Sequence, residues 1–153
     1  MITLRPMTEA EYGPYIAWLR EDYARERAES GETPLEEERE ASSRQIDGLV
    51  PQGLATLNHH FWVMTDEAGT AVGNLWVFVD PNNQRAFIYD IAIAEARRGQ
   101  GLGRQALTAL EDTLRPMGVR RIALNVFGKN TVARHLYETQ GYATVAIAMQ
   151  KDL

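Results

Sequence analysis

The stretch Ala96 to Leu107, ARRGQGLGRQAL, places three glycines within five positions, directly after the apolar run at 88–94. The apolar run predicts a strand. A helix after the glycines is predicted by apolar residues at helical spacing, Leu102, Ala106, Leu107, Leu110 and Leu114. A glycine-rich turn between a strand and a helix start favours an anion, because the first helical N–H groups are unpaired and lie at the positive end of the helix dipole. We therefore expect phosphate to approach this backbone closely, where glycine leaves room for it.

Two common phosphate-binding motifs do not account for this stretch. A nucleoside-triphosphate P-loop requires a lysine directly after its last glycine, and none follows here. Residues 101–106 do satisfy the dinucleotide pattern G-x-G-x-x-A. That pattern also requires an acidic residue about 20 residues further on to bind the ribose, and this chain has Leu124, Asn125 and Val126 there. A lone match to the dinucleotide pattern is therefore weak evidence.

A third interpretation joins two patterns that lie in the same order along the chain. The first is R-x-x-G-x-G over residues 98–103, and the second is N-x-x-A-x-x-L-Y-x-x-x-G-Y over residues 130–142. With both, the chain resembles the GCN5-related N-acetyltransferases (GNAT family) over nearly its whole length. Residues 51–62 and 87–90 also resemble the uncharacterised bacterial YycN-like branch of that family.

The elements that must position these motifs follow from periodicity and from capping signals: a capping box of Thr8 and Glu11, Asn130 as the cap of the last helix, and Gly141 in the left-handed position that ends it. Strands are predicted at 2–5, 61–65, 72–79, 86–94, 121–127 and 142–153, and helices at 8–31, 33–49, 102–114 and 130–139. The order βααβββαβαβ is an α/β plan with a mixed sheet in one domain, residues 1–153. The family resemblance implies the GNAT fold, with about six to seven strands and four helices.

The resemblance also implies acetyl-CoA as cosubstrate. Its pyrophosphate would rest on the backbone of Arg98, Gly99, Gln100, Gly101, Leu102, Gly103 and Arg104, with Asn130, Ala133 and Tyr137 as further cofactor contacts. Arg97, Arg98 and Arg104 are either surface charges or partners of the cofactor phosphates. In this fold the strands at 86–94 and 121–127 diverge and admit the pantetheine arm. Ile91 and Ile93 would offer it main-chain groups, because diverging strands leave N–H and C=O groups unpaired.

Two residues are candidates for the chemistry of amine acetylation. Tyr137 can protonate the leaving thiolate, since a phenol with a pKa of about 10 keeps its proton at neutral pH; it could also be only a half-buried aromatic residue. Asp90 lies inside an apolar strand, where a carboxylate is costly without a partner or a task. A general base and a residue that only shapes the pocket are equally good interpretations of Asp90.

Tyr89 is expected on the strand face opposite Asp90, where it could line the acceptor site, and His60 could edge that site. Adjacent His59 and His60 point to opposite faces of a strand, so a shared metal ion is not expected. Where some relatives carry a glutamate, this chain has Asn125. The resemblance therefore does not transfer a base to that position.

Composition limits the classes of partner. Sixteen Lys and Arg face 21 Asp and Glu, so the net charge of -5 disfavours nucleic acid and anionic lipid. The chain has no cysteine, no run of about 20 apolar residues and no basic segment followed by an apolar one at its start. We expect a cytoplasmic enzyme that acetylates a small-molecule or peptide amine, with a homodimer compatible with the resemblance. A non-catalytic acyl-CoA-binding module is the alternative.

Overall fold

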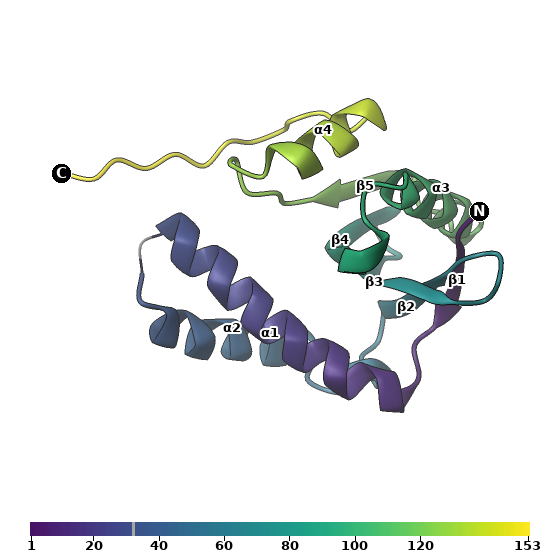
Figure 1. The fold of residues 1–153 in the computed structure, drawn as a ribbon, viewed down its shortest axis with the longest axis horizontal. Coiled ribbons are helices and arrows are strands. Elements are labelled where there is room, and N and C mark those ends of the chain that lie inside the picture. Colours follow the sequence, from purple (N-terminus) through teal and green to yellow (C-terminus); the bar gives the residue numbers. More distant parts are fainter. Residues whose placement is uncertain (32) are drawn as a thin grey trace.

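The computed structural model describes residues 1–31 and 33–153, and its centre is one mixed sheet in the order β1-β2-β3-β4-β5 (Figure 1). The strands are β1 (Thr3–Pro6), β2 (His59–Thr65), β3 (Ala71–Asp80), β4 (Arg85–Ile93) and β5 (Arg121–Leu124). The pairs β1–β2, β2–β3 and β3–β4 are antiparallel, and β5 pairs with β4 in parallel. The α/β plan with a mixed sheet is confirmed.

The described residues form four α-helices, as expected: α1 (Glu9–Gly31), α2 (Leu35–Leu49), α3 (Leu102–Leu114) and α4 (Thr131–Thr139). Local signals begin and end them. The Thr8 N–H donates to Glu11 Oε1 at 3.0 Å and the Glu11 N–H donates to Thr8 Oγ1 at 3.3 Å, a reciprocal capping box at the start of α1. Gly141 has a φ of 94° directly after α4, the left-handed position that commonly closes a helix.

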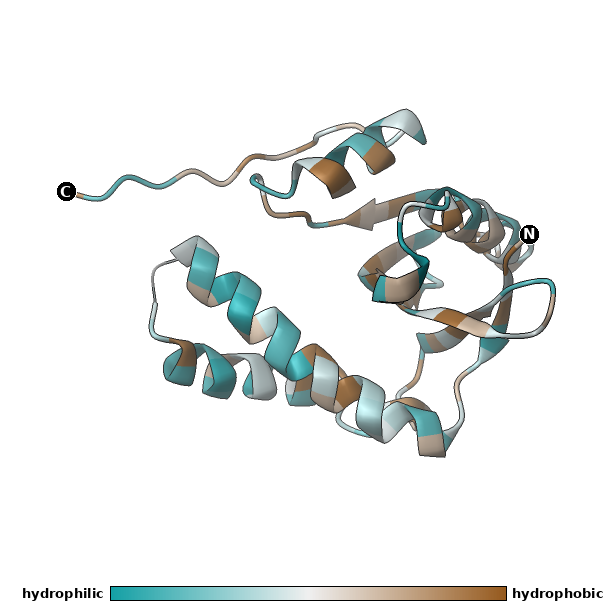
Figure 2. Ribbon diagram, viewed as in Figure 1, coloured by the Kyte–Doolittle hydropathy of each residue, from teal (hydrophilic) through white to brown (hydrophobic). Residues whose placement is uncertain are grey.

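The helices cover both faces of the sheet and form two cores. On one face, α1 and α2 contribute Tyr15, Leu19 and Ile46 to a cluster with Phe61 and Trp76 of the sheet. On the other face, α3 packs on the sheet through its apolar stripe, of which Ala106, Leu107, Leu110 and Leu114 are fully buried. Figure 2 shows the largely hydrophilic colouring of α1 and α2 away from these contacts. The sheet is thus held between two helical layers.

Strands β4 and β5 pair over a short stretch and then diverge. They pair only from Arg85 opposite Arg121 to Ile88 opposite Leu124, while β4 continues to Ile93. The second half of β4 therefore has β3 on one side and no strand on the other within the described part of the chain. This is the divergence that the family resemblance implies.

The sheet has five strands and not the six to seven that were expected, and the order is βααβββαβα. Residues 142–153, predicted as a final strand, run extended away from α4 without pairing. The prediction of a final strand at 142–153 is therefore wrong, because an alternating apolar pattern becomes a strand only when a partner edge accepts its hydrogen bonds.

Gly73 of β3 determines how closely β3 and β4 approach beside the end of β4. A Cβ at this position would collide with the backbone carbonyl of Ala92. We expect Gly73→Ala to lower the free energy of unfolding by about 1–3 kcal/mol, the usual cost of overpacking, measured by urea denaturation. Gly48→Ala in α2, where a Cβ meets nothing within 4 Å, is the matched control and should gain about 0.5–1 kcal/mol. Equal stability of Gly73→Ala and the wild type would contradict the steric argument.

Candidate active site

The loop between β4 and α3 presents a run of unpaired backbone N–H groups. Within residues 1–31 and 33–153, none of the amides of residues 99–104 donates a hydrogen bond; the next, Gln105 N–H, reaches the Gly101 carbonyl at 3.3 Å. No side chain caps the start of α3. Six consecutive free donors at the positive end of a helix form a cradle that fits a pyrophosphate. The residues present therefore suit the cofactor that the resemblance implies.

The three glycines of this loop are required for different physical reasons, the backbone conformation at two of them and close packing at the third. Gly99 and Gly101 have φ of 76° and 77°, a left-handed conformation that side chains disfavour, and a Cβ at either would meet open space. Gly103 lies in α3, and its Cβ would come within 2.9 Å of the Leu136 side chain in α4. Gly99 and Gly101 therefore shape the backbone and leave open space beside it, and Gly103 also lets α4 pack against α3.

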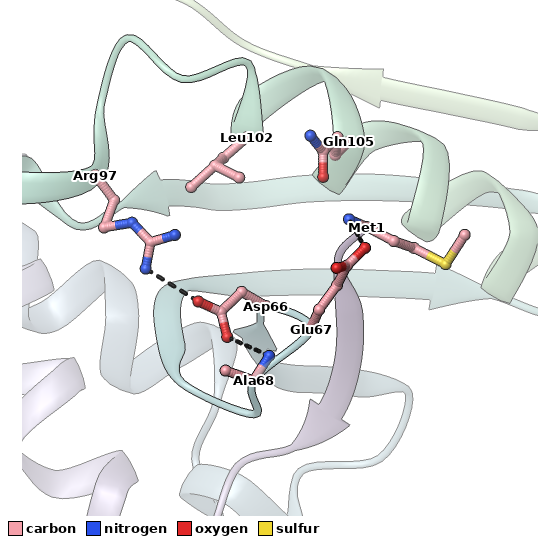
Figure 3. A pocket seen from close by; sticks show the side chains of 7 residues that line it. All are labelled: Met1, Asp66, Glu67, Ala68, Arg97, Leu102 and Gln105. Atoms are coloured by element: carbon pink, nitrogen blue, oxygen red, sulfur yellow. Dashed lines mark hydrogen bonds and ion pairs between the residues drawn. The ribbon is translucent and has the colours of Figure 1, made fainter.

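The three arginines around the cradle make different contacts. Arg97 donates from Nη1 to Asp66 Oδ2 at 3.1 Å and from Nε to Gln100 Oε1 at 3.2 Å. It therefore ties the loop to the β2–β3 turn (Figure 3), and its guanidinium is occupied by Asp66 and Gln100. Arg98 donates from Nε to the Ile93 carbonyl at 3.1 Å. Arg104 is exposed on the first turn of α3.

Figure 3 shows a shallow pocket between that turn and α3, lined by Met1, Asp66, Glu67, Ala68, Arg97, Leu102 and Gln105. Two charge pairs occupy this pocket, Arg97 with Asp66 and the N-terminal amine with Glu67 at 3.3 Å. Neither Asp90 nor Tyr137 lines it. We assign it to anchoring the cradle and not to chemistry.

The free edge of β4 points its main-chain groups into the gap left by β5. Ala94 N–H donates to the Val72 carbonyl at 2.8 Å, which fixes the alternation of the antiparallel β3–β4 pair. Because the direction of the hydrogen bonds alternates along a strand, the groups of Ile93 and Ile91 face away from β3. The two residues named for cofactor contact thus have their main-chain groups at the open edge.

A β-bulge brings Tyr89 and Asp90 to the same side of the sheet. Trp76 pairs with Asp90 and Val77 with Ile88, so Tyr89 is the extra residue. Asp90 Oδ2 accepts a hydrogen bond from Tyr15 Oη of α1 at 2.6 Å, and the Tyr89 ring stacks on Trp76 at a centroid distance of 4.7 Å in the same α1-side cluster. The expectation that Tyr89 faces away from Asp90 is therefore wrong, because a bulge breaks the two-residue alternation.

Asp90 has the electrostatics of a proton acceptor. The pKa of its carboxyl is raised to about 7, mainly by burial; the hydrogen bond from Tyr15 lowers it, and the charges of Asp22 and Glu26 add to the rise. A base whose pKa lies close to the working pH is efficient at taking a proton. The Tyr15 phenol stays protonated to make its bond, since burial and the Asp90 charge raise the pKa of Tyr15 well above its ordinary value.

Asp22 and Glu26 of α1 form an acidic wall that the sequence interpretation missed. Burial is the main cause that raises the pKa of both carboxyls, and within the described part of the chain neither forms an ion pair. Two like charges one helical turn apart weaken a helix slightly. That spacing in the helix at 8–31 was a signal that could have found them, but only the tertiary structure places them opposite Asp90.

Tyr137 lies on α4, close enough to Asp90 and Glu26 for their charges to affect its pKa. Burial raises the pKa of Tyr137 to about 12, followed by the charges of Asp90 and Glu26. The phenol is therefore fully protonated at neutral pH, as a proton donor must be. Asn130 caps α4, its side chain accepting from Ala133 N–H at 3.2 Å, as predicted. The fold thus assembles Asp90, Glu26 and Tyr137 from β4, α1 and α4.

The two histidines lie on opposite faces, as expected, but the nearer one is His59. Its ring stacks on Tyr89 at 5.8 Å, and its Nδ1 accepts from Trp76 Nε1 at 2.9 Å. His60 stacks at 5.2 Å on Trp62, which belongs to the α3-side core. The prediction that His60 edges the acceptor site lined by Tyr89 is thus wrong, since strand alternation places only one of the two histidines on that face and sequence alone does not say which.

No group of three His, Asp or Glu side chains suited to a metal ion occurs among residues 1–31 and 33–153. Across the same residues, every helix is too short or too polar to cross a bilayer.

Asp90 should oppose folding when it is ionised. Its pKa of about 7 lies above the ordinary 3.8, so the penalty is absent below pH 4, grows between the two values and is complete above pH 7. We expect Asp90→Asn to melt higher than the wild type at pH 8, with the difference vanishing near pH 4, measured by thermal denaturation across pH.

Asp47→Asn is the control with the opposite sign. A hydrogen bond from Arg20 lowers the pKa of Asp47, so its contribution to stability is present at neutral pH and lost on acidification. Asp47→Asn should therefore melt at or below the wild-type temperature at pH 8. A wild-type melting temperature for Asp90→Asn at pH 8 would show that the carboxylate is not strained by burial.

Comparison with known proteins places this geometry in a family. The profile of the acetyltransferase (GNAT) family matches residues 14–142. The uncharacterised N-acetyltransferases YycN and YdgE of Bacillus subtilis (strain 168) are 39% and 37% identical, and each alignment covers 99% of this chain and 99% and 98% of the relative. The non-catalytic alternative finds no support in these relatives.

Solved structures agree with the sequence relatives. The crystal structure of YycN matches 100% of this chain and 99% of its own with a TM-score of 0.96 at 37% identity. Spermidine N-acetyltransferase from Vibrio cholerae, solved with CoA and spermine, shares the fold alone, with a TM-score of 0.67 at 19% identity over 95% of this chain and 82% of its own. The family match over residues 14–142, together with a divergent β4–β5 pair that has an amide cradle at its mouth, shows that this chain belongs to the acetyltransferase (GNAT) family, whose acetyl donor is acetyl-CoA.

Proposed function

We propose that the enzyme moves the acetyl group of acetyl-CoA to a primary amine by direct attack in a ternary complex. The observation that carries the proposal is that a carboxyl with a pKa of about 7, Asp90 at the open edge of β4, lies near enough to a phenol with a pKa of about 12, Tyr137, for the charge of Asp90 to raise the pKa of that phenol. Amine acetylation needs one group to accept a proton and another to give one.

The cofactor is held by main-chain groups along one line. Its pyrophosphate lies on the free amides of residues 99–104, with Arg98 and Arg104 beside it. Its pantetheine arm follows the free edge of β4 at Ile91 and Ile93 in place of a strand. Asn130 and Ala133, at the start of α4, close the other side.

Side chains of this enzyme then accept and donate the protons that acetyl transfer requires. The neutral amine forms a C–N bond with the thioester carbonyl carbon and the C–S bond breaks. The proton of the attacking nitrogen passes to the Asp90 carboxylate, directly or through water, and the Tyr137 phenol protonates the departing thiolate. The Ile93 N–H stabilises the negative charge that builds on the carbonyl oxygen.

The acceptor is a small-molecule or peptide amine that carries a second positive charge. Burial is the main cause that raises the pKa of all three carboxyls, and the charges of Asp22 and Glu26 add to the rise at Asp90, so a cation beside them offsets both the cost of burial and the repulsion. A neutral amine would leave that repulsion in place.

The direct test is acetyl transfer with a panel of amines. The protein is incubated with acetyl-CoA and matched mono- and diamines, peptides, and a metabolite extract, and products are identified by mass spectrometry. We expect a mass increase of one acetyl group on a cationic amine. Binding of acetyl-CoA by calorimetry without transfer to any amine would favour the non-catalytic module instead.

Tyr137→Phe tests the proton donor. Removing the phenol should lower turnover about 10²-fold while calorimetry shows unchanged acetyl-CoA affinity, because the ring and its packing remain. Tyr142→Phe is the matched control: its ring lies 5.7 Å from that of Tyr137, and its buried hydroxyl has no partner within the described residues. Loss of activity in Tyr142→Phe alone, or full activity in Tyr137→Phe, would remove Tyr137 from its role.

Glu26→Gln tests the acidic wall. For a diamine acceptor, KM should rise about three- to tenfold with kcat kept, and the effect should shrink at high salt. Glu37→Gln, on the exposed first turn of α2, should change neither value. An unchanged KM in Glu26→Gln would leave the preference for a cationic acceptor without support.

A further inference from the structure

The C-terminal segment, residues 143–153, has the sequence of an interior strand in an exposed position. Val145, Ile147 and Met149 alternate on one side and are 95%, 76% and 90% exposed, while Ala146 and Ala148 lie between them. A run that is apolar on both sides is typical of a strand covered on both faces. Figure 2 shows this apolar stretch along a segment that projects from the body.

The segment's backbone is also unpaired. Within the described part of the chain, no main-chain N–H or C=O of residues 143–153 takes part in a hydrogen bond, and the one side-chain contact is Gln150 Nε2 to the Ser30 carbonyl at 3.4 Å. A row of free donors and acceptors on a flat apolar strand is a template for pairing with another edge.

The elements that adjoin the segment, β5 and α4, are only partly covered by other parts of the chain. No residue after Val119 is buried, although β5 and α4 carry Ile122, Leu124 and Leu136. Helix α4 has a clear apolar side and yet no buried residue, and its Val132 is 83% exposed. The outer edge of β5, opposite its pairing with β4, has no strand within the described residues. An apolar strand and an open apolar edge therefore occur on the same chain.

We propose that two copies of this chain exchange these segments, so that residues 143–149 of each pair as a strand with the outer edge of β5 of the other. Eleven extended residues span roughly 36 Å, long enough to reach a neighbouring copy. One two-fold operation supplies the missing cover on both chains, because each chain donates the strand that the other accepts. The exchange joins the two sheets into one.

The path of the segment supports a second copy over a return to its own sheet. The chain leaves α4 at Gly141 and runs straight past α4 without turning back onto β5 (Figure 1). The YycN crystal structure matches all of this chain with a TM-score of 0.96. Because that score averages over every aligned residue, the segment must take a similar path there.

The exchange has a consequence for the candidate active site. The covered elements are β5 and α4, and α4 carries Asn130 at its cap and Tyr137 on its apolar side. The partner's segment therefore completes the layer that holds this wall of the site. The proposal does not depend on which acceptor the enzyme uses.

Sedimentation and light scattering of the full chain test the assembly. We expect twice the 17.2 kDa mass of one chain. Ile147→Asp places a charge in the exchanged strand and should give a folded monomer by circular dichroism. Leu57→Asp, at another 81% exposed apolar residue remote from the segment, is the matched control and should stay dimeric. A monomeric wild type, or an Ile147→Asp variant that stays dimeric, would overturn the proposal.

Cross-linking distinguishes exchange from a return to the same chain and does not rely on a disruptive variant. Because the chain has no cysteine, Ala123→Cys in β5 can be combined with one cysteine at each of 145–148 in turn. After mild oxidation, exchange gives a covalent dimer on a non-reducing gel at one or more of these positions. Disulfides only within single chains, or none at any position, would contradict it.

Discussion

Two parallel neighbours of unequal length determine the geometry of this enzyme. Strand β4 has nine residues and β5 has four, and they pair only over the first part of β4. Because a strand without a neighbour must find partners for its main-chain groups elsewhere, the second half of β4 is an edge inside the molecule. The amide cradle begins where that edge ends. The line along which a pantetheine arm and a pyrophosphate can lie is therefore a property of the backbone, to which side chains add the chemistry.

The bulge at Tyr89 gives that edge the carboxyl that we propose as the proton acceptor. It turns Asp90 toward α1, where Tyr15 donates one hydrogen bond and two further acids lie nearby. A carboxyl in this environment opposes folding at neutral pH, and a neutral residue there would be more stable. Such a residue at the mouth of a gap is the usual mark of a functional site, where stability is given up for a pKa suited to the reaction.

The cradle is kept in place by contacts that do not touch the ligand. Arg97 joins the loop to Asp66 in the β2–β3 turn, and Leu136 of α4 fits over Gly103. The loop therefore responds to the position of α4, the helix that carries Tyr137. The position of α4 therefore determines the position of both Tyr137, the proposed proton donor, and the start of α3, which is why an uncovered α4 matters for more than stability.

The sequence by itself determined what depends on near neighbours in the chain. The Thr8 and Glu11 capping box, the Asn130 cap, the left-handed Gly141 and the helical spacing of α3 follow from local backbone chemistry, and all were predicted. The paired motifs identified the family and the cradle for the same reason, since each lies within one turn and one helix.

Only the tertiary structure decided which side chains meet. It showed that a bulge puts Tyr89 beside Asp90, that His59 and not His60 faces them, and that Asp22 and Glu26 of α1 complete the acidic wall. It also left the last predicted strand unpaired, because the sequence of a strand does not show whether another strand offers it a free edge. Bulge, register and pairing depend on contacts between residues distant in the chain, and their free energies arise only when the sheet and helices are assembled.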